Sequence, residues 1–444
     1  MSLMLLSAGS LPVAWTLPTQ AYAPNITVTN ATTAMYQLSS DSEFAFILSE
    51  YLSLANEGGA ASGEILRAAA VIEAGDFESW YKEFTFLAEK IGAQAEKAEK
   101  NKALVSAREA YFRSSSYYRA ADFFLHGNQS DPRIYTVWDK QKVAFNKAVG
   151  LLSRPGTFVE LKADGFTVPA YFYPANPQLP ANQGAPKRRL PTVIVGTGYD
   201  GSQQAIYHSN CLEIIERGWN CITYEGPGQP TVRRDQDMGF IPEWWEVVTP
   251  VVDYARARHD VDIDKVALMG VSYGGLLAPL AATKERRLAA VVALDGMLSL
   301  KRAVLTLLGT QITELYSSGN ETEFNNYMTA ALAQDVPTSF RWLIEQGMWS
   351  FNTTDPYTFI SRMGDIYLDK EKLDKIECPV FVGSGEDDNL APVQPEEMAR
   401  LLGPERSHYF LFKTELGAGE HSGLGGEQQI ALESLIWLDK VFEK

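Results

Sequence analysis

The sequence predicts an α/β fold in which a mostly parallel, doubly wound sheet follows an N-terminal helical domain. Three observations predict it. Apolar residues recur at helical spacing through residues 41–152, short apolar runs alternate with helical segments after Pro155, and a serine between glycines joins one such run to the next helix. Continuous apolar strands between helices are typical of a parallel sheet that is covered on both faces.

The N-terminal part of this pattern is helical. Trp80, Phe84, Leu87 and Ile91 fall at positions i, i+4, i+7 and i+11, which form one face of a helix. Such a face most often packs against other helices, so we expect these side chains in the core. Residues 41–152 are therefore predicted to form a helical cap domain.

The first 40 residues precede the cap. Residues 1–23 resemble a signal peptide because residues 4–17 are mostly apolar and Ala21-Tyr22-Ala23 has the form of a cleavage site. However, no Lys or Arg precedes the apolar run, and Pro12 interrupts it. Residues 24–40 are rich in Thr, Asn and Ser and are predicted to be a linker arm.

Secretion is slightly favoured over a cytoplasmic location. Besides the N-terminus, five Asn-x-Ser/Thr sequons support it, at Asn25, Asn30, Asn128, Asn320 and Asn352. No other stretch approaches the roughly 20 apolar residues that a membrane-spanning helix requires.

Residues 153–444 are predicted to form the second, α/β domain. Its expected strands are Thr157–Lys162, Phe166–Tyr173, Thr192–Val195, Asn220–Tyr224, Val266–Met269, Ala289–Leu294, Pro379–Val382 and His408–Phe412. Its expected helices are Ser202–Arg217, Pro242–Arg258, Tyr273–Thr283, Gln394–Leu402 and Glu427–Phe442. Residues 296–375 interrupt the alternation and are predicted to be a helical, aromatic insertion.

Charge and cysteine content exclude several classes of function. The formal net charge of -16 argues against binding to nucleic acid or to an anionic membrane, because phosphates would be repelled. None of the three cysteines forms a CxxC pair, which argues against a zinc or redox site. Cys211 and Cys221 would pair if their helix and strand are neighbours, but unpaired buried thiols are favoured. The sequence leaves a homodimer open.

The strongest chemical signal is a G-x-S-x-G motif between the strand Val266–Met269 and the following helix. Gly270 and Gly274 flank Ser272, and a tight turn of this kind has no room for larger side chains at the glycines. The turn raises the Ser272 hydroxyl to the carboxyl end of the sheet, at a helix N-terminus whose dipole favours negative charge. Ser272 is therefore the predicted nucleophile.

A serine hydroxyl needs a base to act as a nucleophile. Among the five histidines, only His421 lies in a loop after the last predicted strand, where the chain order serine, acid, histidine requires the base. The other four lie in predicted helices or at the ends of elements, at His126, His208, His259 and His408.

The acid of a catalytic triad is expected after a strand between the nucleophile and the histidine. Asp388 follows Pro379–Val382, and its position in the loop favours it as the carboxylate that orients His421. Its neighbour Asp387 is the rival. Asp295, after an earlier strand, is the third candidate.

Two backbone N–H groups should stabilise the oxyanion of a tetrahedral intermediate. One is that of Tyr273, and the other is expected at Tyr199 in the glycine-rich loop 196–201. Glu225, in a turn after another strand, is predicted with equal weight either to contact the substrate or to hold the turn through hydrogen bonds.

Together these motifs resemble the α/β-hydrolases, from about residue 41 onward. The chain resembles the 2,6-dihydroxypseudooxynicotine hydrolase type and the fungal hydrolases of polyketide, fusarin and cytochalasin pathways. The further marks of this resemblance are Tyr111-Phe-Arg113, Tyr117-Tyr118-Arg119-Ala120, Gly198-Tyr199-Asp200-Gly201, Tyr224-Glu225-Gly226-Pro227-Gly228, Gly385-Glu-Asp-Asp388 and Gly419-Glu-His421.

The resemblance implies a serine hydrolase that cleaves an ester, an amide or a carbon–carbon bond beside a carbonyl group of a small molecule, without a metal or an organic cofactor. The sequon-rich N-terminus departs from the pattern and keeps a secreted esterase or aminopeptidase in play. A non-catalytic binding protein on the same fold is disfavoured, because Ser272, Asp388 and His421 are all present.

Overall fold

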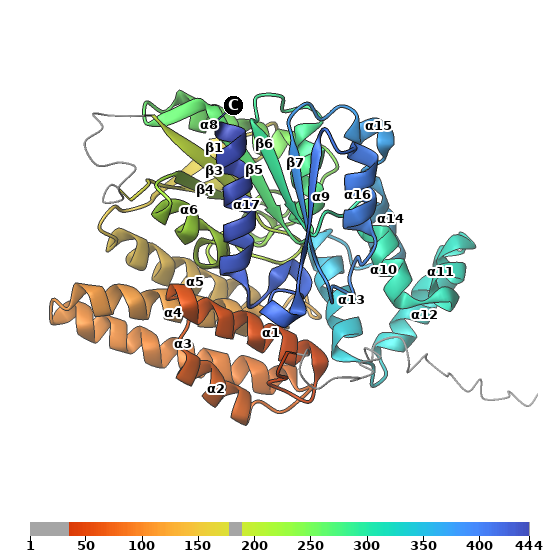
Figure 1. Cartoon of the computed structure of the whole chain (residues 1–444). Helices are drawn as coiled ribbons and strands as arrows, with labels where there is room; N and C mark the ends of the chain where they lie inside the picture. The colour runs from red at the N-terminus through yellow and green to blue at the C-terminus, as the bar shows by residue number, and fades with distance from the viewer. Residues whose placement is uncertain (1–34, 177–188, 444) are drawn as a thin grey trace, which may run out of the picture.

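An eight-stranded sheet forms the centre of the molecule. The structure is a computed structural model that describes residues 35–176 and 189–443. Helices cover both faces of the sheet, and a separate group of helices from the N-terminal part of the chain packs beneath it (Figure 1). The predicted α/β fold class is therefore confirmed. The predicted signal segment 1–23, most of the arm 24–40, and the sequons Asn25 and Asn30 lie outside the described residues.

The strand order is β1-β2-β4-β3-β5-β6-β7-β8. The first two pairings, β1 with β2 and β2 with β4, are antiparallel, whereas all the others are parallel. The strands are β1 (Thr157–Lys162), β2 (Thr167–Tyr173), β3 (Leu190–Gly196), β4 (Asn220–Tyr224), β5 (Val261–Val271), β6 (Ala290–Leu294), β7 (Val380–Gly385) and β8 (Ser407–Phe412).

Alternate residues of each central strand enter two different cores. Ile194 of β3 packs in one core with α8 (Trp245–Ala257), α9 (Gly274–Ala282) and α16 (Gln394–Leu402). Its neighbours Val193 and Val195 pack on the opposite face, in a core that includes residues of α6 (Leu212–Glu216) and α17 (Glu427–Phe442). Because both faces are buried, the strands read as continuous apolar runs in the sequence.

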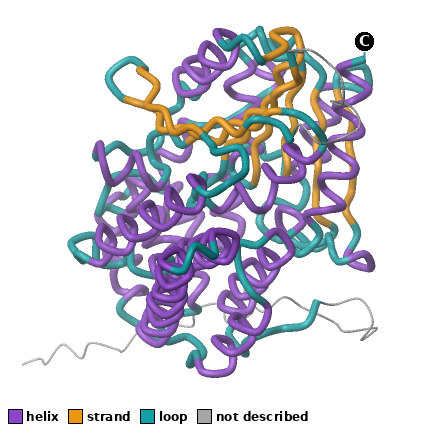
Figure 2. The backbone as a smooth tube through the Cα atoms, turned by 90° about the vertical axis from the view of Figure 1, so that its left-hand side faces the viewer, coloured by secondary structure: helices purple, strands orange, loops and turns teal. Residues whose placement is uncertain are grey.

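The N-terminal helices extend the second of these cores. They are α1 (Ser42–Ser53), η1 (Leu54–Glu57), α2 (Ser62–Val71), α3 (Phe77–Lys100), α4 (Leu104–Asp122) and α5 (Arg133–Gly150). The predicted apolar face of α3 is confirmed as core, since Trp80, Phe84, Leu87 and Ile91 are at most 6% exposed. Figure 2 shows these helices as a layer distinct from the strands.

Further helices occur in the sequence between consecutive strands, most of them between β6 and β7. Residues 296–375 form α10 (Leu300–Leu308), α11 (Thr310–Ser317), α12 (Glu321–Leu332), α13 (Thr338–Ser350), α14 (Pro356–Asp365) and α15 (Lys370–Leu373). A short helix that the sequence pattern did not predict, α7 (Pro230–Gln236), follows β4. The single helix predicted over Ser202–Arg217 is instead a π-helical turn, η3 (Tyr207–Cys211), that leads into α6.

A disulfide joins Cys211 at the end of η3 to Cys221 in β4, with the two Cα atoms 5.8 Å apart. The prediction of unpaired buried thiols is therefore wrong. Periodicity alone did not reveal that the turn packs directly against the neighbouring strand. Cys378 is the one free cysteine within residues 35–176 and 189–443. Within the same ranges, no helix is long and apolar enough to cross a bilayer.

Candidate active site

The serine turn lies where β5 ends and α9 begins. Ser272 has a φ of 61°, a left-handed conformation that is uncommon for a residue with a side chain and typical of functional turns. A Cβ atom at Gly270 would overlap the carbonyl of Gly274, and one at Gly274 would lie 2.9 Å from the carbonyl oxygen of Thr197. Glycine is therefore required at both positions, as the motif predicts.

The structure brings the three predicted residues Ser272, His421 and Asp388 together. The Oγ atom of Ser272 lies 2.8 Å from Nε2 of His421. On the other side of the ring, Nδ1 of His421 lies 3.0 Å from Oδ2 of Asp388. The rival Asp387 does not contact the imidazole, and its Oδ2 atom accepts a hydrogen bond of 2.6 Å from the Thr414 hydroxyl instead.

A second carboxylate, Asp295, lies beside the same ring. Its Oδ2 atom is 3.4 Å from Nδ1 of His421 and accepts a hydrogen bond of 2.5 Å from the Ser422 hydroxyl. Although burial alone would lower the pKa of His421, the carboxylates of Asp388 and Asp295 raise it above its usual value. Burial, and then the nearby Asp388, raises the pKa of Asp295, while His421 opposes the rise.

Asp295, Asp388 and His421 also have donor atoms within 4.8 Å of one another, which is close enough for a cation site. In the described chain both ring nitrogens of His421 are already engaged, one with the Ser272 hydroxyl and the other with the Asp388 carboxylate, so hydrogen bonding explains this cluster. The sequence ranked Asp295 only third as the acid. Its approach to the ring depends on how β6 lies beside β7, which the sequence does not give.

The glycine-rich loop predicted to supply an oxyanion donor lies directly against Ser272. A Cβ atom added to Gly198 would be 2.8 Å from the backbone nitrogen of Tyr273 and 3.0 Å from Cβ of Ser272. Within the described chain, no hydrogen bond runs from the amide of Tyr199 or of Tyr273 to another protein group. Both amides are therefore unused donors close to the serine.

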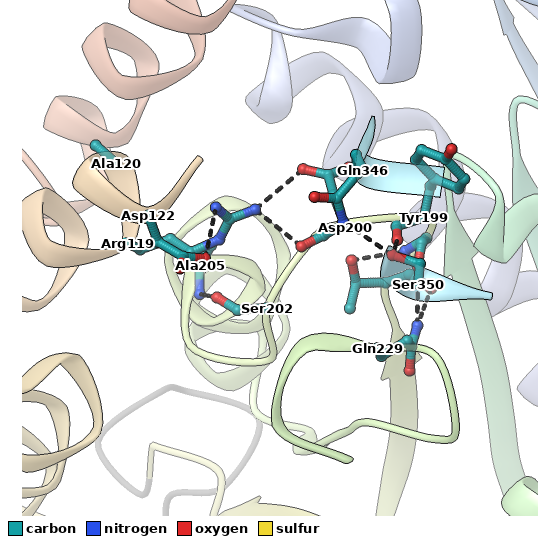
Figure 3. Close-up of polar contacts among 12 residues, drawn as sticks. Arg119, Ala120, Asp122, Tyr199, Asp200, Ser202, Ala205, Gln229, Gln346 and Ser350 are labelled. Carbon is teal, nitrogen blue, oxygen red and sulfur yellow. Dashed lines mark hydrogen bonds and ion pairs between the residues drawn. The ribbon is translucent and has the colours of Figure 1, made fainter. Parts of the chain in front are cut away.

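Three side chains hold this loop in place (Figure 3). Gln229 donates to the carbonyl oxygens of Thr197, at 2.8 Å, and Gly198, at 3.1 Å. The Tyr199 hydroxyl donates to the carbonyl oxygen of Leu343 in α13, at 2.7 Å. The Ser350 hydroxyl donates to the carbonyl oxygen of Tyr199, at 3.3 Å.

Arg119 of α4 links the cap helices to the same loop. It donates to the carbonyl oxygen of Asp200, at 2.8 Å, and to the carboxylate of Asp200, at 3.0 Å (Figure 3). Site prediction from the sequence missed this pair. Both residues stand in motifs of the family resemblance, but a motif without an alignment gives neither residue a role.

Glu225 does not line the active-site cavity, so the structure does not support its predicted contact with substrate. The side chain is fully buried, and its two oxygens accept hydrogen bonds from the backbone N–H groups of Gln203, at 2.9 Å, and Thr231, at 2.6 Å. Burial raises the pKa of this carboxyl. The alternative prediction, a carboxylate that holds its turn together, agrees with these contacts.

Ser272 and His421 open into a cavity of about 710 Å³. Its walls come from α1, the loop around Tyr199, α10 and α13, so that both the cap and the insertion cover the serine. A volume of this size suits a ligand of drug-like dimensions. Apolar side chains from the cap and the insertion line it, among them Phe46, Phe123 and Trp342.

Comparison with known proteins agrees with this geometry. Residues 175–423, more than half of the chain, match the family model of the X-Pro dipeptidyl-peptidase (S15 family). The chain is 32% identical to the alpha/beta hydrolase psoB of Aspergillus fumigatus, over 77% of this chain and 79% of that protein. It is 29% identical to the 20-hydroxy-prefusarin hydrolase FUS2 of Gibberella moniliformis, over 86% of this chain and 93% of that protein.

Among solved structures, the 2,6-dihydroxy-pseudo-oxynicotine hydrolase has the same fold. It superposes with a TM-score of 0.68 at 19% identity, over 88% of this chain and 95% of that one. The resemblance inferred from the motifs is thereby confirmed. The chain belongs to the X-Pro dipeptidyl-peptidase (S15) family and is a hydrolase of the α/β-hydrolase fold.

Proposed function

We propose that this chain is a serine hydrolase that cleaves a bond beside a carbonyl group of a small molecule. The observation that carries the proposal is the hydrogen-bonded series from Ser272 through His421 to Asp388, at the wall of a cavity of about 710 Å³. Side chains in such a series act as nucleophile, base and orienting acid in unrelated serine enzymes.

In the proposed reaction, Nε2 of His421 accepts the proton of Ser272 as Oγ attacks the substrate carbonyl carbon. The negative charge that develops on the carbonyl oxygen is stabilised by the N–H groups of Tyr199 and Tyr273. Asp388 holds the ring and stabilises the imidazolium. Collapse breaks the bond to the leaving group, which takes the proton from His421, and water then releases the acid by the same steps in reverse.

The leaving group is proposed to be an alcohol, an amine or a stabilised carbanion. A carbon leaving group would take its proton from His421 or from water. The similarity to FUS2, whose name gives 20-hydroxy-prefusarin as the compound on which it acts, supports a polyketide-like substrate in the biosynthesis of a fungal secondary metabolite. A compact substrate is proposed because the cap and the insertion both cover the serine and limit the space around it.

A second candidate is a secreted esterase or aminopeptidase. The match of residues 175–423 to a peptidase family favours it. Two further sequons, Asn128 and Asn320, lie on exposed residues where glycans can be accommodated. Release of a dipeptide from an X-Pro anilide by the secreted protein at a rate above that of any ester would favour this candidate over the first.

The proposed role of the serine is tested by comparing Ser272→Ala with the wild type on p-nitrophenyl esters and on a β-dicarbonyl compound. We expect kcat to fall by about 10⁴-fold or more, because the nucleophile and base act as a unit. Ser318→Ala, which changes an exposed serine on the surface, is the matched control and should behave as wild type. Retention of full activity in Ser272→Ala would exclude the mechanism.

A further inference from the structure

The wall of the cavity carries an excess of acidic over basic side chains. Seven carboxylates line the cavity and no Lys or Arg does, within the part of the chain that the structure describes. One of them, Asp200, is paired with Arg119. Aromatic rings lie in the same wall, among them Phe46 and Trp342, and such rings attract cations through their faces.

Two of these carboxylates, Glu43 and Glu50, come from α1. They are seven residues apart, so they lie on the same face of the helix. No hydrogen bond or ion pair joins either carboxylate to another group of the described chain. Burial, and then neighbouring carboxylates, raises the pKa of Glu43 to about 8. Burial, and then Asp200, raises that of Glu50 to about 7, against the attraction of Arg119.

An independent observation comes from Glu427 at the start of α17. This side chain is only 9% exposed and lines the cavity. Its Oε1 atom accepts hydrogen bonds from the Ser53 hydroxyl, at 2.6 Å, and from the backbone of Gly425, at 3.2 Å. Its Oε2 atom is buried and has no hydrogen-bond partner among the described residues. A buried carboxylate oxygen without a hydrogen-bond donor is costly, so a positive charge beside Glu427 would offset the cost of burying it.

We propose that Glu43, Glu50 and Glu427 form an acidic wall that binds a cationic group of the substrate, a protonated amine or a quaternary ammonium, while the carbonyl group reaches Ser272. The inference rests on the proposed function, to which it adds the class of substrate. All three glutamates lie outside the residues 175–423 that match the family model, so the acidic wall is built by other parts of the chain.

The test is a titration by NMR with choline and with 3,3-dimethyl-1-butanol, which share a shape and differ in the positive charge. We expect choline to bind at least about tenfold more tightly than the alcohol, because interactions that involve a charged group are stronger than those between neutral groups. The preference should grow as the pH rises through about 7 to 8, where the pKa values of Glu50 and Glu43 lie.

Substitutions of single glutamates test whether the preference for choline comes from the acidic wall. Glu50→Gln should lower the ratio of the two affinities about tenfold. Glu43→Gln serves as a second variant if the first fails to fold. Glu89→Gln on the outer surface of α3, where the side chain is 55% exposed, is the matched control and should keep the ratio of the wild type.

Equal affinities for the two compounds in the wild type, or a ratio that neither Glu50→Gln nor Glu43→Gln changes, would overturn the inference. Because the titration needs no turnover, its result is independent of the serine chemistry. A protein that prefers choline but hydrolyses nothing would contradict the proposed function and support the acidic wall. A protein that hydrolyses neutral esters and does not prefer choline would do the reverse.

Discussion

Gly198 offers a sharp test of the proposed oxyanion hole. Its φ is not in the left-handed region, so alanine can adopt the same backbone conformation and only space limits the substitution. In Gly198→Ala the new Cβ would lie 2.8 Å from the backbone nitrogen of Tyr273 and 3.0 Å from the carbonyl oxygen of Val271. Both neighbours are backbone atoms, which cannot rotate away.

The loop and the serine turn must therefore separate by about half an ångström to restore ordinary van der Waals contact. The methyl group would also cover the N–H of Tyr273, where the oxyanion is proposed to bind. Loss of one such donor reduces kcat by about 10² to 10³-fold, or roughly 3–4 kcal/mol of transition-state stabilisation. We expect Gly198→Ala to lose kcat/KM by this factor.

The assay is hydrolysis of a p-nitrophenyl ester, with circular dichroism and thermal unfolding to show that the fold is intact. Gly63→Ala in α2 is the matched control, because a Cβ there meets no atom within 4 Å, and it should keep the activity of the wild type. A folded Gly198→Ala enzyme with kcat/KM within threefold of the wild type would refute the placement of the oxyanion hole.

Three further predictions concern the surroundings of the site. Asp295→Asn should move the acidic limb of the pH profile of kcat/KM to lower pH by about one unit, because His421 must be neutral to act as the base and the Asp295 carboxylate raises the pKa of His421. An acidic limb at the same pH as in the wild type would show that Asp295 does not influence the pKa of His421. Arg119→Met should lower the free energy of unfolding by about 2 kcal/mol, because Asp200 loses its cationic partner while Asp122 keeps Arg234. It should also lower kcat/KM, because the loop around Asp200 loosens; urea denaturation and ester hydrolysis measure the two effects, and an unchanged urea midpoint would contradict the prediction. Reduction of the Cys211–Cys221 disulfide should cost about 2–3 kcal/mol of unfolding free energy, since the bond closes a loop of 10 residues; equal urea midpoints with and without reductant would contradict the bond.

The residues that meet at the centre could be predicted from sequence because their placement depends on local geometry and chain order. The turn around Ser272 requires glycine on both sides, and this requirement is visible in five consecutive residues. His421 followed from elimination, since four other histidines occupy unsuitable places. Asp388 was favoured over Asp387 by spacing alone, and the hydrogen bond to His421 agrees with that choice.

Contacts between distant segments could not be predicted. Arg119 and Asp200 are 81 residues apart, and only the packing of α4 against the loop brings them together. The acidic wall joins residues of α1 to the start of α17, and no periodicity relates these helices. The sequence left two predictions of equal weight for Glu225. The burial of its side chain distinguishes a turn carboxylate from a substrate ligand, and burial is known only once the fold is known.

The proposed mechanism depends above all on Ser272 acting as a nucleophile that His421 activates. The most direct measurement is mass spectrometry of the intact protein after treatment with a fluorophosphonate, followed by peptide mapping. We expect one adduct, on Ser272, that is absent in Ser272→Ala and forms far more slowly in His421→Ala. A protein that gains no adduct, or gains it on another residue while Ser272 stays unmodified, would show that Ser272 is not the activated nucleophile.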